Sequence, residues 1–233
     1  MPADGYGVMP MSFRTFVIGD IHGCAATLRR LVNEILHVSA PDRIYLLGDL
    51  IDRGPDSKGV LDFIFDLREG CVHVDGIRGN HEDMFLRSAD DPYYQALWAA
   101  NGGLATLASF RADGPRGIPS RYRDLLDSLP LYILLDDFVL VHAGLNFDTP
   151  DPFEDTEAML WTRSQFVDRK RIGGRRLICG HTTIRRALLE ASLTSDKIML
   201  DNGCVFPDQP ALGNLAALEL ESMTLFLQPN IDR

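Results

Sequence analysis

Short apolar runs alternate with amphipathic stretches through the first third of the chain. Residues 14–20 form an apolar run that ends in Gly-Asp, which is typical of a buried strand. Similar runs at 43–49 and 71–77 predict two more strands. The intervening stretches repeat apolar residues at helical spacing, and residues 82–87 predict a third helix start. The apolar positions of the first two helices are Leu28, Leu31, Val32, Ile35 and Leu36, then Val60, Leu61, Ile64 and Phe65. This alternation predicts parallel βαβ units.

The rest of the chain follows a different pattern. Residues 96–110 predict helices, and a Gly/Pro-rich loop follows at 114–119. A hairpin is predicted where Asp136-Asp137 separates the apolar segments 131–135 and 138–142. A second hairpin is predicted from segments 215–220 and 223–227. Strands at 177–180 and 197–200 lie between the hairpins. We therefore expect an α/β protein with a mixed β-sheet sandwich flanked by helices.

The domain organisation is simple. The chain has 233 residues, no internal repeat and no low-complexity linker, which favours a single domain over residues 13–233. Residues 1–12 lack the basic and apolar segments of a signal peptide, and we expect them to form a flexible leader. No apolar run approaches the ~20 residues that span a bilayer. We expect a cytoplasmic location and no membrane partner.

The net charge and the cysteine content bear on two questions: whether the protein binds nucleic acid, and whether it contains disulfides. The formal net charge of -10 argues against a general nucleic-acid binder, which needs a basic surface, although a site that holds cations can be locally positive. The four cysteines are scattered without a C-x-x-C pair, so we expect reduced core residues rather than disulfides. They are Cys24, Cys71, Cys179 and Cys204.

Five polar segments follow predicted strands. They are Gly-Asp-Ile-His-Gly at 19–23, Gly-Asp-Leu-Ile-Asp-Arg-Gly at 48–54, Gly-Asn-His-Glu at 79–82, His-Ala-Gly at 142–144 and Gly-His-Thr at 180–182. In open α/β sheets, sites are built at the carboxyl ends of strands. Each segment alone would be an ordinary loop or a core histidine, but together they predict one site. His37 and His73 fall outside these segments, and we expect them to be structural or exposed.

The residue types suit a pair of metal ions. Two cations held about 3.5–4 Å apart repel each other and therefore need anionic ligands, preferably one shared carboxylate. Imidazole, carboxylate and amide ligands select borderline transition metals, and the lack of thiolate pairs argues against structural zinc.

The five segments, in this order, resemble the phosphoprotein phosphatase family within the calcineurin-like metallophosphoesterase superfamily. The segments Asn101-Gly102-Gly103 and Leu160-Trp161-Thr162-Arg163 are similar to those of small bacterial and phage-type members. The loop Asp201-Asn202-Gly203-Cys204 also resembles bacterial members, without the longer tyrosine-bearing loop of the eukaryotic enzymes. The resemblance implies a metal-dependent phosphoester hydrolase, foremost a serine/threonine protein phosphatase.

The resemblance also implies a role for each matching residue. Asp20, His22 and Asp49 would hold the first metal, with Asp49 bridging to the second. Asn80, His142 and His181 would complete the second site. His81 would be the general acid, oriented by Asp52. Arg53 and Arg163 would bind the phosphate oxygens, although the match at Arg163 is short and a surface arginine is its alternative. The metal implied is manganese, with iron, zinc or magnesium as alternatives.

These roles agree with the chemistry of phosphate ester hydrolysis. A hydroxide that bridges two cations is available near neutral pH, because metal binding lowers the pKa of water, and it would attack phosphorus in line. Phosphoryl transfer depends on positioning and charge stabilisation, which two arginines supply. An alkoxide leaving group needs a proton from an acid such as imidazolium.

Three functions remain open. A symmetrical diadenosine tetraphosphate hydrolase shares the same motifs, so the substrate can be a phosphoprotein or a small phosphoester. A non-catalytic scaffold is a remote alternative, because such a protein would be expected to lose the acid or a ligand.

The basic residues Arg169, Lys170, Arg171, Arg175 and Arg176 form either a solvated loop or a contact for an anionic substrate arm.

Overall fold

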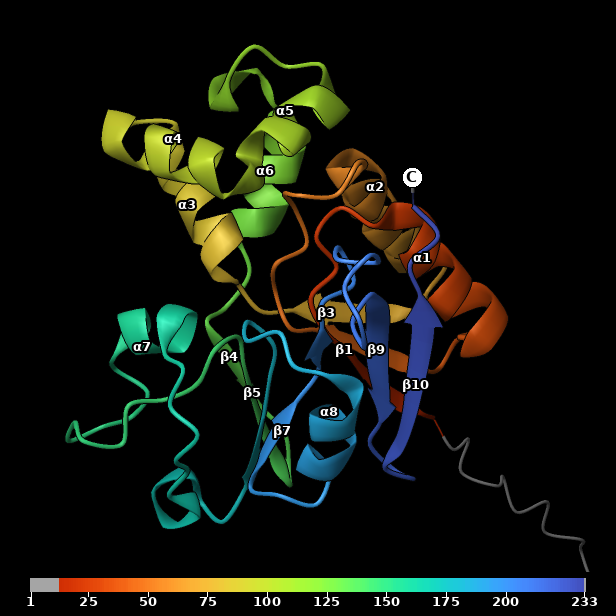
Figure 1. The fold of residues 1–233 in the computed structure, drawn as a ribbon, viewed down its shortest axis with the longest axis vertical. Coiled ribbons are helices and arrows are strands. Elements are labelled where there is room, and N and C mark those ends of the chain that lie inside the picture. The colour runs from red at the N-terminus through yellow and green to blue at the C-terminus, as the bar shows by residue number, and fades with distance from the viewer. Residues whose placement is uncertain (1–12, 233) are drawn as a thin grey trace, which may run out of the picture.

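Two β-sheets pack against each other in the computed structural model, which describes residues 13–232 (Figure 1). The larger sheet has the order β10-β9-β1-β2-β3, with β8 paired to β9. Its strands are β1 (Thr15–Ile18), β2 (Arg43–Leu46), β3 (His73–Gly76), β8 (Asp201–Asn202), β9 (Asn214–Glu219) and β10 (Thr224–Pro229). The smaller sheet, in the order β4-β5-β6-β7, contains β4 (Tyr132–Leu134), β5 (Phe138–Val141), β6 (Arg176–Cys179) and β7 (Lys197–Met199).

Both sheets mix parallel and antiparallel pairs. Strands β1, β2 and β3 are parallel to one another, as are β5, β6 and β7. The predicted hairpins are confirmed, because β4 pairs antiparallel with β5, and β9 with β10. The expected mixed sandwich flanked by helices is confirmed. Within each parallel set the carboxyl ends of the strands share one edge of the sheet, which is where the polar segments begin.

Helices flank the two sheets, and several of them gather at the top of the view in Figure 1. Most of them lie between β1 and β4 in the sequence: α1 (Ala25–Arg30), α2 (Ser57–Glu69), α3 (Asn80–Ser88), α4 (Pro92–Trp98), α5 (Leu104–Phe110) and α6 (Ser120–Asp127). Two others, α7 (Thr156–Trp161) and α8 (Arg186–Ser192), lie beside the smaller sheet. Short 3-10 turns occur at Pro115–Gly117 and Arg169–Ile172.

The core is layered. One apolar cluster joins the two sheets and includes Val17 and Leu218 of the larger sheet and Leu140, Ile178 and Ile198 of the smaller one. A second cluster fills the space between the larger sheet and the helices. A smaller cluster lies under α7. Successive strand residues point to opposite faces, so each central strand contributes to two of these layers.

Two expectations from the sequence are wrong in detail. Ile35, assigned to the apolar face of the first helix, is 40% exposed. The helix continues as a π-helix over Leu31–Ile35, where Leu36 N–H bonds Leu31 C=O, and the wider turn shifts the apolar face. Cys71, expected in the core, is exposed because β3 begins only at His73. The other three cysteines are buried, and all four are free.

The leader expected at residues 1–12 lies outside the described residues, and the single-domain assignment stays a prediction. Over residues 13–232, no helix has the length and apolar character to cross a membrane. His37 and His73 are both exposed and lie away from the polar segments, as expected.

Candidate active site

The five polar segments converge at the carboxyl ends of five strands. Asp20 follows β1, Asp49 follows β2, Asn80 follows β3, His142 follows β5 and His181 follows β6. The first four of these residues are no more than 3% exposed, and His181 is half-buried. Both sheets therefore contribute polar groups to one buried place.

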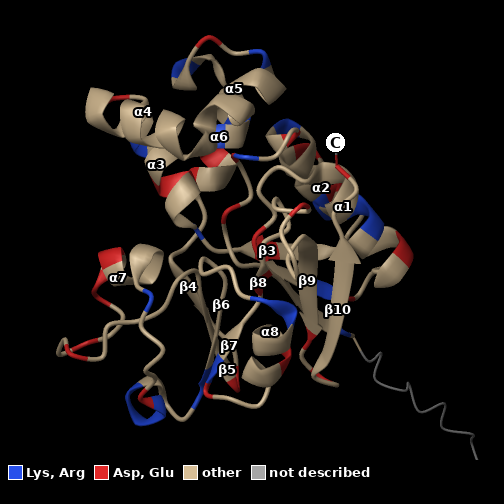
Figure 2. Cartoon of the chain, in the orientation of Figure 1, with Lys and Arg blue, Asp and Glu red and all other residues tan. Residues whose placement is uncertain are grey.

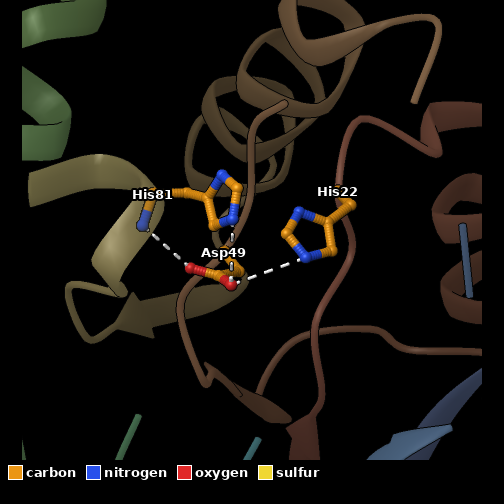
Figure 3. A group of neighbouring side chains, drawn as sticks. All are labelled: His22, Asp49 and His81. Atoms are coloured by element: carbon orange, nitrogen blue, oxygen red, sulfur yellow. Dashed lines mark hydrogen bonds and ion pairs between the residues drawn. The ribbon is translucent and has the colours of Figure 1, made fainter. Parts of the chain in front are cut away.

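Asp49 is common to two groups of side chains with metal-ligand geometry. His22, Asp49 and His81 form the first group, drawn in Figure 3. Asp49, His142 and His181 form the second. Within each group the ligand atoms lie within 4.8 Å of one another. A carboxylate shared between two such groups is what a pair of neighbouring cations requires.

Asn80 and Asp20 border these groups. Asn80 Oδ1 lies 2.9 Å from His142 Nε2 and 3.1 Å from His181 Nδ1, so the amide belongs to the second group. Asp20 falls outside both groups; its carboxylate accepts the His181 backbone N–H at 3.0 Å. The first group thus contains His81 and not Asp20.

Backbone carbonyls orient two of the imidazoles. His22 Nδ1 lies 3.0 Å from Ile51 C=O, and His142 Nδ1 lies 2.8 Å from Leu47 C=O. A carbonyl in this place accepts a hydrogen bond from Nδ1–H, which leaves the Nε2 lone pair free to bind a metal. The two Nε2 atoms lie 3.5 and 3.4 Å from Asp49 carboxylate oxygens. Nε2 of His81 and of His181 are buried without a hydrogen-bond partner among the described residues.

Buried negative charge accumulates at the same place. Burial, together with the charges of Asp201 and Asp49, raises the pKa of Asp20 well above its usual value. Burial and Asp49 raise the pKa of Glu82 to about 7. Burial also acts to raise the pKa of Asp49, but the three neighbouring imidazoles outweigh it and hold that pKa below its usual range. Oxygen and nitrogen donors among closely spaced buried carboxyl groups fit divalent cations.

A carboxylate holds His81 in place. Asp52 Oδ2 lies 2.7 Å from His81 Nδ1, and both side chains are fully buried. Trp98 Nε1 donates to both oxygens of Asp52 at 2.8 and 3.0 Å, and Thr106 Oγ1 donates at 2.6 Å. Burial lowers the pKa of His81, but Asp49 and Asp52 outweigh it and raise that pKa above its usual value. Asp49 and Asp52 therefore stabilise the imidazolium form relative to that of a free histidine.

The two predicted phosphate-binding arginines lie at the rim of the site. Arg53 is exposed, and its Nη1 lies 2.6 Å from His22 Nε2. Arg163 is exposed, and its positive charge contributes to a lowered pKa at His181, where burial is the main cause. The ring of Trp161 meets His181 edge-on at 6.1 Å. Both guanidinium groups therefore lie near the imidazoles of the site.

Backbone strain is concentrated in these segments. Five residues with side chains adopt positive φ angles between 47° and 73°: His22, Asp49, Asp52, Arg53 and His181. Such left-handed conformations are uncommon for residues other than glycine and are found where a site over-determines them.

Sequence reasoning assigned no role to Glu82, which is fully buried. Its carboxylate accepts the backbone N–H groups of Asp49, Leu50 and Gly79 at 2.8–2.9 Å. This carboxylate therefore fixes the loop that carries Asp49. The spacing Gly79-x-x-Glu82 is the spacing of a helix capping box, and that signal could have identified it. Trp98 and Thr106 were also missed, because nothing in their local sequence shows that they approach Asp52.

The arginines of the basic segment after α7, visible as a blue turn at the lower left of Figure 2, bond backbone carbonyls. Arg169 donates to Gly174 C=O, and Arg171 donates to the carbonyls of Phe147, Thr149 and Pro150. In the same way, Arg175 bonds Leu135 C=O and Arg176 bonds Leu193 and Ser195 C=O. These side chains hold loops together.

The chain belongs to the calcineurin-like phosphoesterase family, whose pattern it matches over residues 13–193. It is 31% identical over 206 residues to serine/threonine-protein phosphatase 1 of Salmonella typhimurium, covering 86% of this chain and 91% of that protein. It is 34% identical to the symmetrical bis(5'-nucleosyl)-tetraphosphatase of Nitrosospira multiformis, over 56% of this chain but only 43% of that protein. A solved structure of a cold-active protein-tyrosine phosphatase from a Shewanella species shares the fold, with a TM-score of 0.64 at 16% identity over 95% of this chain and 83% of that one.

These likenesses establish a metallophosphoesterase, a family that depends on two metal ions. The relatives carry names with different substrates, so family membership defines the chemistry and leaves the substrate open.

Proposed function

We propose that this protein is a serine/threonine protein phosphatase that uses two divalent cations, with manganese as the activating metal. The observation that carries the proposal is the buried convergence of Asp49 with imidazoles from both sheets. The phosphatase of Salmonella typhimurium supports the substrate class, because the likeness extends over most of both chains. The choice of manganese rests on the family resemblance. We also propose a cytoplasmic location, because all four cysteines are free.

The proposed ligands divide into two sets around Asp49. Asp20 and His22 join it at the first metal, and Asn80, His142 and His181 join it at the second. Bound divalent cations lower the pKa of water and neutralise phosphoryl charge. Arg53 Nη1 now uses the His22 Nε2 lone pair that would face the first metal. We therefore expect Arg53 to turn away from His22 and toward the phosphate when the site is loaded.

His81 is proposed as the general acid. Asp52 fixes the ring through Nδ1 and favours its protonated form, while Nε2 faces the site without a partner among the described residues. A proton on Nε2 can pass to the leaving alkoxide of a serine or threonine ester. His81 also lies close enough to Asp49 and His22 to bind a metal. A substitution of His81 therefore has to distinguish a general acid from a metal ligand.

Arg53 and Arg163 are proposed to bind the phosphoryl oxygens. A guanidinium presents paired donors that match phosphate geometry. Arg163 has no bonded side-chain partner over residues 13–232, so it is free to make this contact. Arg163→Ala should lower kcat/KM by about 10- to 100-fold without loss of metal, because a hydrogen bond to a charged group contributes roughly 1.5–3 kcal/mol.

A symmetrical diadenosine tetraphosphate hydrolase is the second candidate, since a relative with that name matches 56% of this chain. Parallel kinetics on a phosphoserine/phosphothreonine peptide panel and on diadenosine tetraphosphate test the proposal. We expect the larger kcat/KM on the peptides. A larger kcat/KM on the dinucleotide would overturn the phosphatase assignment and keep the two-metal chemistry.

A further inference from the structure

A buried lysine connects two loops of the site. We propose that Lys197 is a positioning residue for phosphate binding: its ammonium holds the loop of Arg163 against the loop of His142. The inference rests on the proposed function, because it takes Arg163 as a ligand of the substrate phosphate.

The ammonium bonds one carbonyl on each loop. Lys197 is the first residue of β7 and is only 5% exposed. Its Nζ donates to Ala143 C=O at 3.0 Å and to Ser164 C=O at 2.7 Å. Ala143 follows the proposed metal ligand His142, and Ser164 follows Arg163. One side chain therefore bonds both the loop of the proposed metal ligand and the loop of the proposed phosphate ligand.

The Lys197 ammonium has no acidic partner among the residues that the structure describes. Over residues 13–232, no carboxylate lies within ion-pair distance of Lys197. Burying a charge without a counter-ion is costly, and a methionine would occupy nearly the same space without that cost. The ammonium donates hydrogen bonds to two carbonyls, one on each loop. We take these two bonds as the reason for a lysine at this position.

Apart from apolar contacts, the Arg163 loop has few links to other elements. The ring of Phe166 meets Phe147 edge-on at 5.8 Å. Residues 162–168 form no regular secondary structure between α7 and the next turn. The other hydrogen bonds of this stretch are local, such as Ser164 N–H to Thr162 Oγ1 and Gln165 Nε2 to Arg163 C=O. Among the described residues, the bond from Lys197 is the one that reaches residues 163–167 from a distant element. Val167 adds apolar packing at the far end.

The test compares Lys197→Met with Arg163→Ala in the manganese-loaded protein, with p-nitrophenyl phosphate as substrate and inorganic phosphate as inhibitor. Lys197→Met should raise KM and the phosphate inhibition constant about 10-fold and change kcat less. This loss lies below the roughly 100-fold that a misplacement of about 1 Å can cost. Bound metal should be unchanged, because no ligand is removed.

The double variant shows whether Lys197 acts through Arg163. If it does, Lys197→Met adds nothing once Arg163 is alanine; independent roles would multiply the two losses and overturn the inference. Ile198→Val loosens the same strand without touching either carbonyl, and Lys170→Met makes the same chemical change on the surface. Both controls should leave phosphate inhibition at the wild-type value.

Three further outcomes have definite meanings. If Lys197→Met does not fold, Lys197→Gln keeps a polar group at the position and the same phosphate measurement applies. Wild-type phosphate inhibition in Arg163→Ala would overturn both the arginine's proposed role and this inference. If only diadenosine tetraphosphate is hydrolysed, the proposed substrate class fails, but phosphate inhibition still decides the role of Lys197.

Discussion

His81 is placed to act in two ways, and single substitutions can distinguish them. His81→Asn should slow hydrolysis of alkyl phosphate esters by ~10²–10⁴-fold, the usual share of general acid catalysis. A nitrophenyl ester has a better leaving group and should be affected less. The measurement is kcat for both esters, together with bound metal. Equal losses on both esters would show that His81 is not the general acid, and loss of a metal ion would show that it is a ligand.

Gly180 leaves room for the carboxylate of Asp20. A Cβ added at Gly180 would lie 1.9 Å from Asp20 Oδ1, so Gly180→Ala must displace that carboxylate. We expect metal affinity to fall about 10- to 100-fold, as when groups that orient metal ligands are changed. Metal titration followed by activity measures this. Gly114→Ala is the control, because its added Cβ would meet nothing within 4 Å. Unchanged affinity in Gly180→Ala would argue that Asp20 is not a ligand.

At the scale of secondary structure elements, the sequence predicts the strands better than their surroundings. Apolar runs located the central strands, and the Asp136-Asp137 and Glu221-Ser222 pairs located both hairpins. The π-helix over Leu31–Ile35 was not predicted, because its 3.6-residue apolar pattern looks like an ordinary helix. The contacts of Lys197 and Trp98 were not predicted either. They join elements 33 and 46 residues apart, and no local pattern encodes such a contact.

An ion pair at the start of the larger sheet provides a prediction about pH. Asp42 precedes β2 and accepts hydrogen bonds from Arg14 N–H at 3.0 Å and Nη2 at 2.6 Å, and from Ser39 N–H. Burial acts to raise the pKa of Asp42, but these bonds outweigh it, so the folded pKa lies below the usual value. The stabilisation is therefore complete above the unfolded pKa of about 3.9 and is lost as pH falls through the folded pKa.

Asp42→Asn should accordingly lower the free energy of unfolding by about 1–3 kcal/mol at pH 7. The difference from wild type should shrink as pH falls below about 4. Urea unfolding at pH 7, 4 and 3 measures this. Asp136→Asn, at an exposed position without a bonded partner in residues 13–232, should show no such trend. A deficit in Asp42→Asn that stays constant with pH would mean that lost packing, rather than lost charge, destabilises the variant.

Across the whole molecule, the proposed ligands come from both sheets. Asp20 and Asp49 follow strands of the larger sheet, whereas His142 and His181 follow strands of the smaller one. Sequence order alone placed these residues at strand ends, but it could not show that the two sheets present them to each other. That arrangement depends on the apolar layer between the sheets, which includes Val17, Leu140 and Ile198.

Metal binding should therefore stabilise the entire fold. Cations held by the proposed ligands would join the two sheets and neutralise buried carboxylates, and neither effect would be available to the unfolded chain. At a metal concentration 100 times Kd, one site contributes about 2.7 kcal/mol. For a chain of this length, each kcal/mol raises Tm by roughly 2–4 °C. Removal of metal with a chelator should thus lower Tm by about 5–10 °C for each site emptied, and manganese should restore it.

Asp49→Asn distinguishes metal binding at this site from a general ion effect. Since Asp49 belongs to both ligand groups, its variant should bind neither metal tightly and should show almost no Tm response to manganese. Substitution of His37, an exposed histidine, should preserve the full response. Metal analysis alongside the melting curves completes the test. Two tightly bound ions in Asp49→Asn, or an unchanged manganese response, would show that Asp49 does not bridge the metals and that the link between the sheets lies elsewhere.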